Sequence, residues 1–145
     1  MRLLLLGCTG FVGRELVPAL LEADHQLTLV SRRLARGYEA ERADGRLTWL
    51  QLDPAKSVSW QTPELVEALS TSDAVVNLAG EPIAEKRWTA AHRKVLEDSR
   101  LETTRFLVDA MVALASPPAV LINASAIGFF GTSPKRWVIG ANTNP

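Results

Sequence analysis

Three glycines at regular spacing, Gly7, Gly10 and Gly13, are the first residues whose pattern points to chemistry. They follow four consecutive leucines, typical of a parallel strand buried on both faces, and precede apolar residues at helical spacing. A strand–turn–helix of this kind directs its N–H groups and the positive end of the helix at one place, so it stabilises an anion there. Gly7 would allow the tight turn, Gly10 would let a pyrophosphate approach the backbone, and Gly13 would let the helix pack on the strand. The alternative is a turn that binds nothing.

The end of the next predicted strand bears on which dinucleotide such a turn would bind. An Asp or Glu about 20 residues beyond the glycines accepts a hydrogen bond from a ribose 2′-hydroxyl and favours NAD. This sequence has Ser31 and Arg32 there, followed by Arg33. A guanidinium binds a 2′-phosphate instead, with bidentate geometry available. We therefore predict NADP rather than NAD, with Arg32 as the main contact and Ser31 and Arg33 assisting. The alternative is a solvated basic turn.

Strand and helix patterns alternate along the chain and supply the elements that would position these residues. Such alternation predicts an α/β fold, a Rossmann-type doubly wound parallel sheet with helices on both faces. We expect the strand order 3-2-1-4-5, with a ligand at the carboxyl ends of the strands across the switch point between strands 1 and 4. Thr62 and Thr89 are predicted helix N-caps, and Pro63 a first helical residue. The predicted strands cover residues 3–6, 25–33, 47–52, 73–80 and 119–123, and the predicted helices cover 12–21, 63–70 and 85–115.

Composition and charge exclude several other classes of protein. The chain has 145 residues, 47% of them hydrophobic, which suits one compact domain with a core. Its 16 basic and 16 acidic residues indicate no nucleic-acid or membrane-surface partner, and the leucine run is too short to span a membrane. Cys8 is the only cysteine, so no disulfide framework exists and a cytoplasmic protein is expected. His25 and His92 lack ligand spacing, so we predict no metal site and interpret both as structural or solvated.

With Thr9 included, the glycine turn resembles the Thr-Gly-x-x-Gly-x-x-Gly fingerprint of the short-chain dehydrogenase/reductase superfamily. Residues 10–13, Gly-Phe-Val-Gly, are similar to its extended, epimerase-type branch. The resemblance implies cofactor contacts from Thr9, Phe11 and Val12 in addition to those of the three glycines. It also implies that Asp53, at the end of the third predicted strand, contacts the adenine. A plain turn-forming aspartate is the alternative at that position.

A longer set of motifs resembles one atypical branch, the epimerase-family proteins catalogued as short-chain dehydrogenase family 39U. These motifs are residues 77–83, 87–88, 99–104 and 125–131. The resemblance covers residues 1–134 and implies an NADP-binding Rossmann domain there, followed by an atypical tail over residues 135–145. It also implies that Leu78, Ala79, Gly80 and Arg100 lie near the cofactor. The charge of Arg100 suits a phosphate, and an exposed helix arginine is the alternative.

The residues that superfamily catalysis needs are not all present. That chemistry uses a Tyr as acid or base, a nearby Lys that lowers the pKa of this Tyr, and a Ser that holds the substrate oxygen. The only tyrosine is Tyr38, and residue 42 is Arg, so Tyr-x-x-x-Lys is absent. Ser125 is a candidate for the serine, although the family spacing places the catalytic serine on Ala126. Because family chains are considerably longer, we expect this chain to be the incomplete N-terminal half of an extended short-chain dehydrogenase.

Three functional hypotheses follow, and they leave open whether the chain is an enzyme. The first is an NADP(H)-binding oxidoreductase or nucleotide-sugar-epimerase-like protein that acts on an unidentified small molecule and lacks its catalytic half here. The second is a non-catalytic NADP-binding regulatory protein, because cyanobacterial and plastid relatives have been associated with division. The third is an inactive truncated product that forms a homodimer to cover its exposed sheet edge.

Overall fold

The computed structural model describes residues 1–33, 38–83, 87 and 89–124. Its strands are β1 Arg2–Leu6, β2 Gln26–Ser31, β3 Leu47–Gln51, β4 Ala74–Asn77 and β5 Val120–Asn123. They form one sheet in the order β3-β2-β1-β4-β5, and every neighbouring pair is parallel. The doubly wound sheet and the strand order predicted from the sequence are therefore confirmed.

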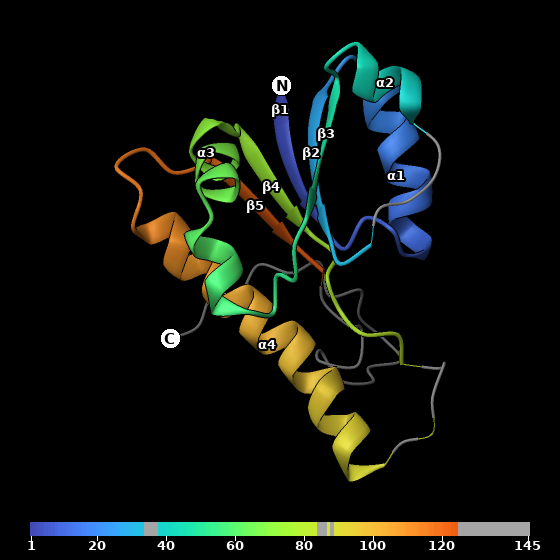
Figure 1. Ribbon diagram of the computed structural model, residues 1–145, viewed down its shortest axis with the longest axis vertical. Coiled ribbons are helices and arrows are strands. Elements are labelled where there is room, and N and C mark those ends of the chain that lie inside the picture. The colour runs from blue at the N-terminus through green and yellow to red at the C-terminus, as the bar shows by residue number, and fades with distance from the viewer. Residues whose placement is uncertain (34–37, 84–86, 88, 125–145) are drawn as a thin grey trace, which may run out of the picture.

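The helices lie on both faces of this sheet. They are α1 Phe11–Glu22, α2 Glu39–Ala43, α3 Pro63–Thr71 and α4 Ala90–Val112, and the short 3-10 helix η1 Ser57–Gln61 precedes α3. Figure 1 shows the sheet between α1 on one side and α3 and α4 on the other. The connections that carry the glycines and the basic residues all leave the carboxyl ends of the strands, so they gather at one edge of the sheet.

The leucine run of β1 belongs to two apolar layers, one on each face of the sheet. Leu3 and Leu5 pack with residues of α1, whereas Leu4 and Leu6 pack with residues of α3 and α4. Leu4, Leu5 and Leu6 are 0% exposed. Because successive side chains of a strand alternate between its faces, four leucines in a row require a strand that is covered on both sides. Burial worth about 1.5–3 kcal/mol per leucine thus anchors the turn that follows β1.

The fourth strand is shorter than the sequence suggested. The expected strand covered residues 73–80, but β4 ends at Asn77. The side-chain Oδ1 of Asn77 accepts a hydrogen bond from the N–H of Ala79 at 3.1 Å. Such a local bond competes with the sheet ladder and turns the chain away from it. Leu78, Ala79 and Gly80 therefore lie in the loop beyond the sheet.

The two predicted helix caps differ in how they work. Thr89 caps α4 as expected, because its Oγ1 accepts a hydrogen bond from the N–H of His92 at 3.1 Å. Thr62 and Pro63 stand at the N-cap and first position of α3, but Thr62 makes no capping bond; its Oγ1 donates to the carbonyl of Ser59 at 2.8 Å. Both threonines nevertheless mark helix starts where the sequence placed them.

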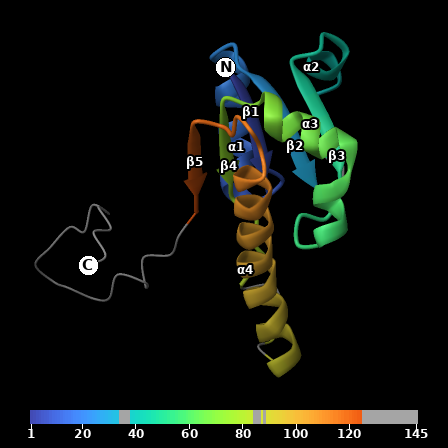
Figure 2. The same ribbon diagram turned by 90° about the vertical axis from the view of Figure 1, so that its left-hand side faces the viewer.

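Helix α4 reaches well beyond the sheet. Figure 2 shows its N-terminal half continuing past the carboxyl ends of the strands, as does Figure 1 in a view at right angles to it. This half carries Ser99 and Arg100 to the level of the strand-end loops. Doubly wound sheets bind ligands in a crevice outside the carboxyl ends of their strands, and α4 would flank such a crevice above β1. Among the described helices, none combines the length and apolar character needed to cross a lipid bilayer.

Candidate functional site

Two of the three glycines in the turn after β1 are required by the packing of the protein itself. Gly7 has φ +73°, and a Cβ on it would lie 2.6 Å from backbone atoms of Ala79. A Cβ on Gly13 would lie 2.0 Å from the carbonyl oxygen of Cys8. No side chain fits at these distances, so the turn can approach the β4 loop and α1 can approach the turn only because both residues are glycine.

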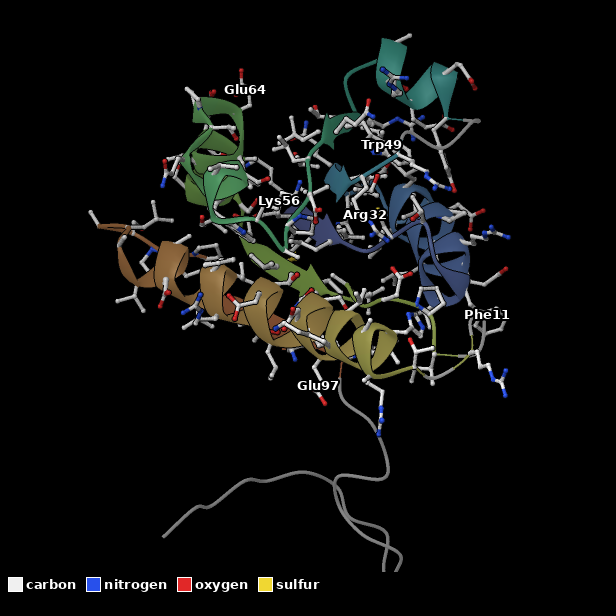
Figure 3. All side chains as sticks on the ribbon, turned by 60° about the horizontal axis from the view of Figure 1, so that its bottom comes forward. Phe11, Arg32, Trp49, Lys56, Glu64 and Glu97 are labelled. Atoms are coloured by element: carbon white, nitrogen blue, oxygen red, sulfur yellow. The ribbon has the colours of Figure 1, made fainter. Side chains whose placement is uncertain are left out.

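Gly10 has no such requirement from the protein. The nearest atom to a Cβ on Gly10 would be the carbonyl oxygen of Gly7 at 3.5 Å, an ordinary contact. Gly10 is the N-cap of α1, it offers no side-chain cap, and the first turn of the helix holds no acidic residue. Phe11 and Val12 are 90% and 57% exposed, and the side chain of Phe11 stands at the edge of the molecule in Figure 3. The open backbone at Gly10 and the uncapped start of α1 therefore suit a ligand anion that comes close to the chain.

Ser31 at the end of β2 uses its hydroxyl proton within the protein. Its Oγ donates to the carbonyl of Arg33 at 2.6 Å and accepts a hydrogen bond from Nε1 of Trp49 at 2.8 Å. Ser31 is 6% exposed. In this arrangement Ser31 stabilises the turn that carries Arg32 and Arg33, because its hydroxyl proton is donated to the backbone carbonyl of Arg33.

Arg32 forms an ion pair with a residue that the sequence patterns did not single out. Its Nη2 lies 3.0 Å from Oε2 of Glu81, and the two side chains are 62% and 10% exposed, respectively. Arg32 follows β2 and Glu81 follows β4, and β1 lies between these strands. The pair therefore spans the carboxyl end of β1, beside the glycine turn. In Figure 3, Arg32 lies near the centre of the strand ends.

Glu81 is held in place by α4. Its N–H donates to Oγ of Ser99 at 2.9 Å, and its carbonyl accepts a hydrogen bond from Nη2 of Arg100 at 3.2 Å. Arg100 also donates through Nη1 to the carbonyl of Leu96 at 3.1 Å. Its guanidinium lies against Gly80, where a Cβ would be 2.8 Å from Cζ. Arg100 thus fastens the β4–α4 loop to the helix, a geometry that helical spacing alone could not reveal.

A polar cluster joins the ends of β4 and β5. Nδ2 of Asn77 donates to Oδ1 of Asn123 at 2.7 Å and to Oγ1 of Thr104 at 3.3 Å. Asn77 is 3% exposed. With its Oδ1 bound to the N–H of Ala79, Asn77 fixes the start of the small-residue loop from both sides. Its place in the Asn-x-Ala-Gly motif was the only sequence signal for this role.

Asp53, predicted as an adenine contact, lies in a tight turn after β3. Its Oδ1 accepts a hydrogen bond from the N–H of Ala55 at 3.1 Å, and its carbonyl accepts one from the N–H of Lys56 at 3.0 Å. This is the bonding of a turn-forming aspartate. Asp53 stays half-buried at the same edge of the sheet as the glycine turn.

Three further features of the sequence analysis are Ser125, the tail and Tyr38. Ser125 and the tail over residues 135–145 lie outside the described residues. Tyr38 has φ +72° at the start of α2 and packs against the core on the α1 side; burial raises its pKa, and the neighbouring Cys8 adds to the rise. Across the described ranges, no cluster of His, Cys, Asp or Glu could hold a metal ion.

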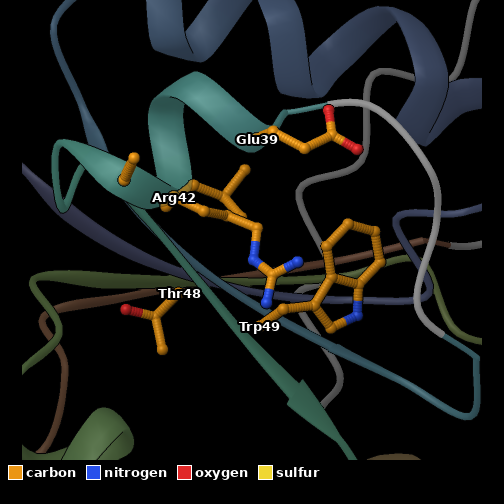
Figure 4. Close-up of a pocket in the computed structure, with 6 residues that line it drawn as sticks. Glu39, Arg42, Thr48 and Trp49 are labelled. Carbon is orange, nitrogen blue, oxygen red and sulfur yellow. The ribbon is translucent and has the colours of Figure 1, made fainter.

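A hollow of about 520 Å³ opens between α2 and the outer strand β3 (Figure 4). None of the predicted cofactor contacts lines it, and it lies at the edge of the sheet, away from the turn after β1. We therefore assign the candidate site to the crevice above β1. The lining residues of the hollow are Glu39, Arg42, Ala43, Leu47, Thr48 and Trp49.

The sequence matches the NAD dependent epimerase/dehydratase family over residues 3–143. Epimerase family protein Mb2239 of Mycobacterium bovis is 38% identical over 136 residues, which are 91% of this chain and 38% of the relative. Human epimerase family protein SDR39U1 is 33% identical over 135 residues, which are 92% of this chain and 39% of the relative. The chain therefore spans about two fifths of the length of these relatives.

Solved structures agree with the fold. The crystal structure of human epimerase family protein SDR39U1 (isoform 2) with NADPH superposes with a TM-score of 0.66 at 32% identity, covering 92% of this chain and 39% of that one. Uronate dehydrogenase from Agrobacterium tumefaciens, solved as a point mutant complexed with NAD, gives a TM-score of 0.63 at 20% identity, covering 86% of this chain and 40% of that one. The second likeness concerns the fold alone.

Proposed function

The chain belongs to the NAD-dependent epimerase/dehydratase family, among the epimerase family proteins related to SDR39U1, and on that premise we propose that it binds NADP(H) in the crevice above β1. A dinucleotide cofactor is common to this family and to the solved neighbours. The choice of NADP over NAD is the further step, and it depends on the residues at the end of β2.

The observation that carries this choice is the exposed guanidinium of Arg32. It stands at the position from which an acidic residue would repel a 2′-phosphate, and 62% of its side chain is accessible. A planar guanidinium offers paired N–H donors that match phosphate oxygens. The similar protein SDR39U1 was crystallised with NADPH, which supports the same choice.

The remaining contacts follow from the geometry of the crevice. The amides at the start of α1, with Thr9, Phe11 and Val12, would hold the pyrophosphate, because Gly10 leaves the backbone open to it. Asp53 would face the adenine, and the loop of Leu78, Ala79 and Gly80 would flank the ribose. Arg33 would add positive charge beside Arg32. Arg100 would act by holding the β4–α4 loop, since two of its nitrogens are bound to backbone carbonyls.

A bound nicotinamide would supply hydride transfer to or from a substrate carbon. We propose an oxidoreductase or epimerase-like reaction on a small molecule as the activity of the whole protein. Such a reaction also needs a proton donor or acceptor at the substrate. Ser125 stands near the expected place in the sequence, and this assignment depends on residues beyond those the structure describes.

The test is a titration of the purified 145-residue chain with NADPH and with NADH, in which the quenching of tryptophan fluorescence measures binding. We expect NADPH to bind at micromolar concentration and more tightly than NADH. Arg32→Ala should weaken NADPH at least about tenfold and leave NADH within about twofold, because only NADPH carries the 2′-phosphate. Arg42→Ala, which removes an exposed arginine of α2, is the matched control. Absence of NADPH binding by a chain with a cooperative unfolding transition would refute the proposal.

A further inference from the structure

The ion pair between Arg32 and Glu81 leads to an inference that deepens the proposed cofactor site and rests on it. We propose that Glu81 is a specificity-determining residue, one whose carboxylate lowers the preference for NADP over NAD by offsetting the charge of Arg32. The pair spans the carboxyl end of β1, where the adenosine ribose of a dinucleotide would lie.

The carboxylate and a 2′-phosphate would share one guanidinium. The described contact joins Nη2 of Arg32 to Oε2 of Glu81 at 3.0 Å, and a guanidinium has further N–H groups that can donate to a phosphate. A phosphate carries a charge of about −1.5 to −2 at neutral pH. The 2′-phosphate would therefore be attracted by the charge of Arg32 and repelled at close range by the carboxylate of Glu81. Removing the carboxylate leaves the attraction uncompensated.

Glu81 cannot readily withdraw from this place when a cofactor arrives. Its carboxylate side chain is only 10% exposed, and its backbone is bound on both sides, through its N–H to Ser99 and through its carbonyl to Arg100. Arg32 is 62% exposed and is the partner that can turn. The negative charge thus stays beside the ribose whichever cofactor is bound.

The same carboxylate would act in the opposite direction on NAD. A ribose 2′-hydroxyl is a hydrogen-bond donor, and an acidic residue near it accepts that bond in NAD-dependent Rossmann proteins. Here the acidic residue comes from the end of β4 rather than from the end of β2. Glu81 should therefore weaken NADPH, strengthen NADH, and narrow the difference between them.

The decisive variant is Glu81→Gln, which keeps the size of the side chain and both backbone hydrogen bonds while removing the charge. We expect the ratio of the dissociation constants for NADH and NADPH to rise about tenfold, a change of about 1.4 kcal/mol. The ratio for 5′-AMP and 2′,5′-ADP should rise equally, because these probes differ only in the 2′-phosphate. Glu97→Gln is the matched control, since it removes the same charge from an exposed position of α4 that points away from the sheet (Figure 3).

Each outcome separates this inference from the proposed function. If the unmodified chain binds NADPH and Glu81→Gln leaves the ratio unchanged or lowers it, Glu81 only positions Arg32 and the inference is wrong. If the unmodified chain binds neither cofactor, the proposed function fails first and the inference falls with it. Should Glu81→Gln fail to fold, Glu81→Met removes the charge without an amide to bury, and the same rise is expected from it.

Discussion

The turn after β1 and the rim formed by Arg32 and Glu81 lie side by side, yet they are built in different ways. In the turn, backbone meets backbone: Gly7 and Gly13 leave no space for a single added carbon. At the rim, the exposed side chain of Arg32 forms an ion pair with the buried carboxylate of Glu81. Backbone packed this closely leaves the turn little space to rearrange, whereas the exposed side chain of Arg32 can turn toward another partner.

This difference assigns different tasks to the two regions. In the proposed site, the backbone of the turn would bind the pyrophosphate, which NAD and NADP share, because N–H groups cannot distinguish the two cofactors. The 2′-position is where they differ, and side chains of opposite charge can be tuned there. The predictions below test whether the turn is set by packing and the rim by charge.

The largest effect is expected from Gly13→Ala. Its Cβ would stand 2.0 Å from the carbonyl oxygen of Cys8, a backbone atom that cannot move without shifting β1 or α1. We expect a loss of about 3 kcal/mol in the free energy of unfolding, at the upper end for overpacking, measured by urea denaturation. Gly10→Ala, which adds the same methyl group with its nearest neighbour at 3.5 Å, is the matched control. A loss below about 1 kcal/mol would mean that the turn yields easily and that the packing argument is wrong.

Gly10→Ala should separate binding from stability. The added Cβ would meet only the carbonyl of Gly7 at 3.5 Å, so the free energy of unfolding should change by less than about 1 kcal/mol. A methyl group at the same point would obstruct a pyrophosphate, so we expect NADPH and NADH to weaken equally, by about thirtyfold or about 2 kcal/mol. Equal weakening is the critical feature, and calorimetric titration of both cofactors measures it. Retained affinity would show that no ligand approaches Gly10.

The turn could be predicted from the sequence because its information is local. Leucines, glycines and an apolar helical pattern occupy residues 3–21 without interruption, and a parallel strand buried on both faces leaves few other choices. Strand order followed from the alternation of strands and helices. The fourth strand was predicted to end at residue 80, whereas β4 ends at Asn77. The hydrogen bond from the N–H of Ala79 to the side chain of Asn77 competes there with the hydrogen bonds between strands.

The rim could be predicted only in part. Arg32 was recognised from its place after the second strand, but its partner Glu81 is 49 residues away in the sequence. Glu81 was visible only as one letter of a family motif, and nothing in that motif indicates which side chain it meets. For the same reason Arg100 was predicted to face a phosphate, although two of its nitrogens bind backbone carbonyls. Long-range pairs of charged side chains have no local pattern.

The burial of Cys8 in the turn predicts that stability depends on pH. Burial raises the pKa of the Cys8 thiol from 9.0 to about 11, so the folded chain holds this proton where the unfolded chain releases it. Stability should therefore be complete below pH 9 and fall as the pH rises toward 11, by about 1 kcal/mol between pH 8 and pH 10. Urea denaturation at both pH values measures it. Cys8→Ala, in which Tyr38 still titrates, should lose most of this slope; an unchanged slope would assign it to other groups.

The smallest effect on the free energy of unfolding is expected from Gly80→Ala. Gly80 lies between Ala79, which contacts the turn at Gly7, and Glu81 of the rim. A Cβ there would lie 2.8 Å from Cζ of Arg100, the far end of a flexible side chain that can swing away. We expect a loss below about 1 kcal/mol, the worth of the hydrogen bond from Arg100 to the carbonyl of Glu81. In an Arg100→Met background the same change should cost still less, which a double-mutant cycle by urea denaturation would resolve. A loss as large as that of Gly13→Ala would instead make the β4–α4 loop part of the rigid turn, and Glu81 would then be fixed by backbone packing as firmly as the glycines are.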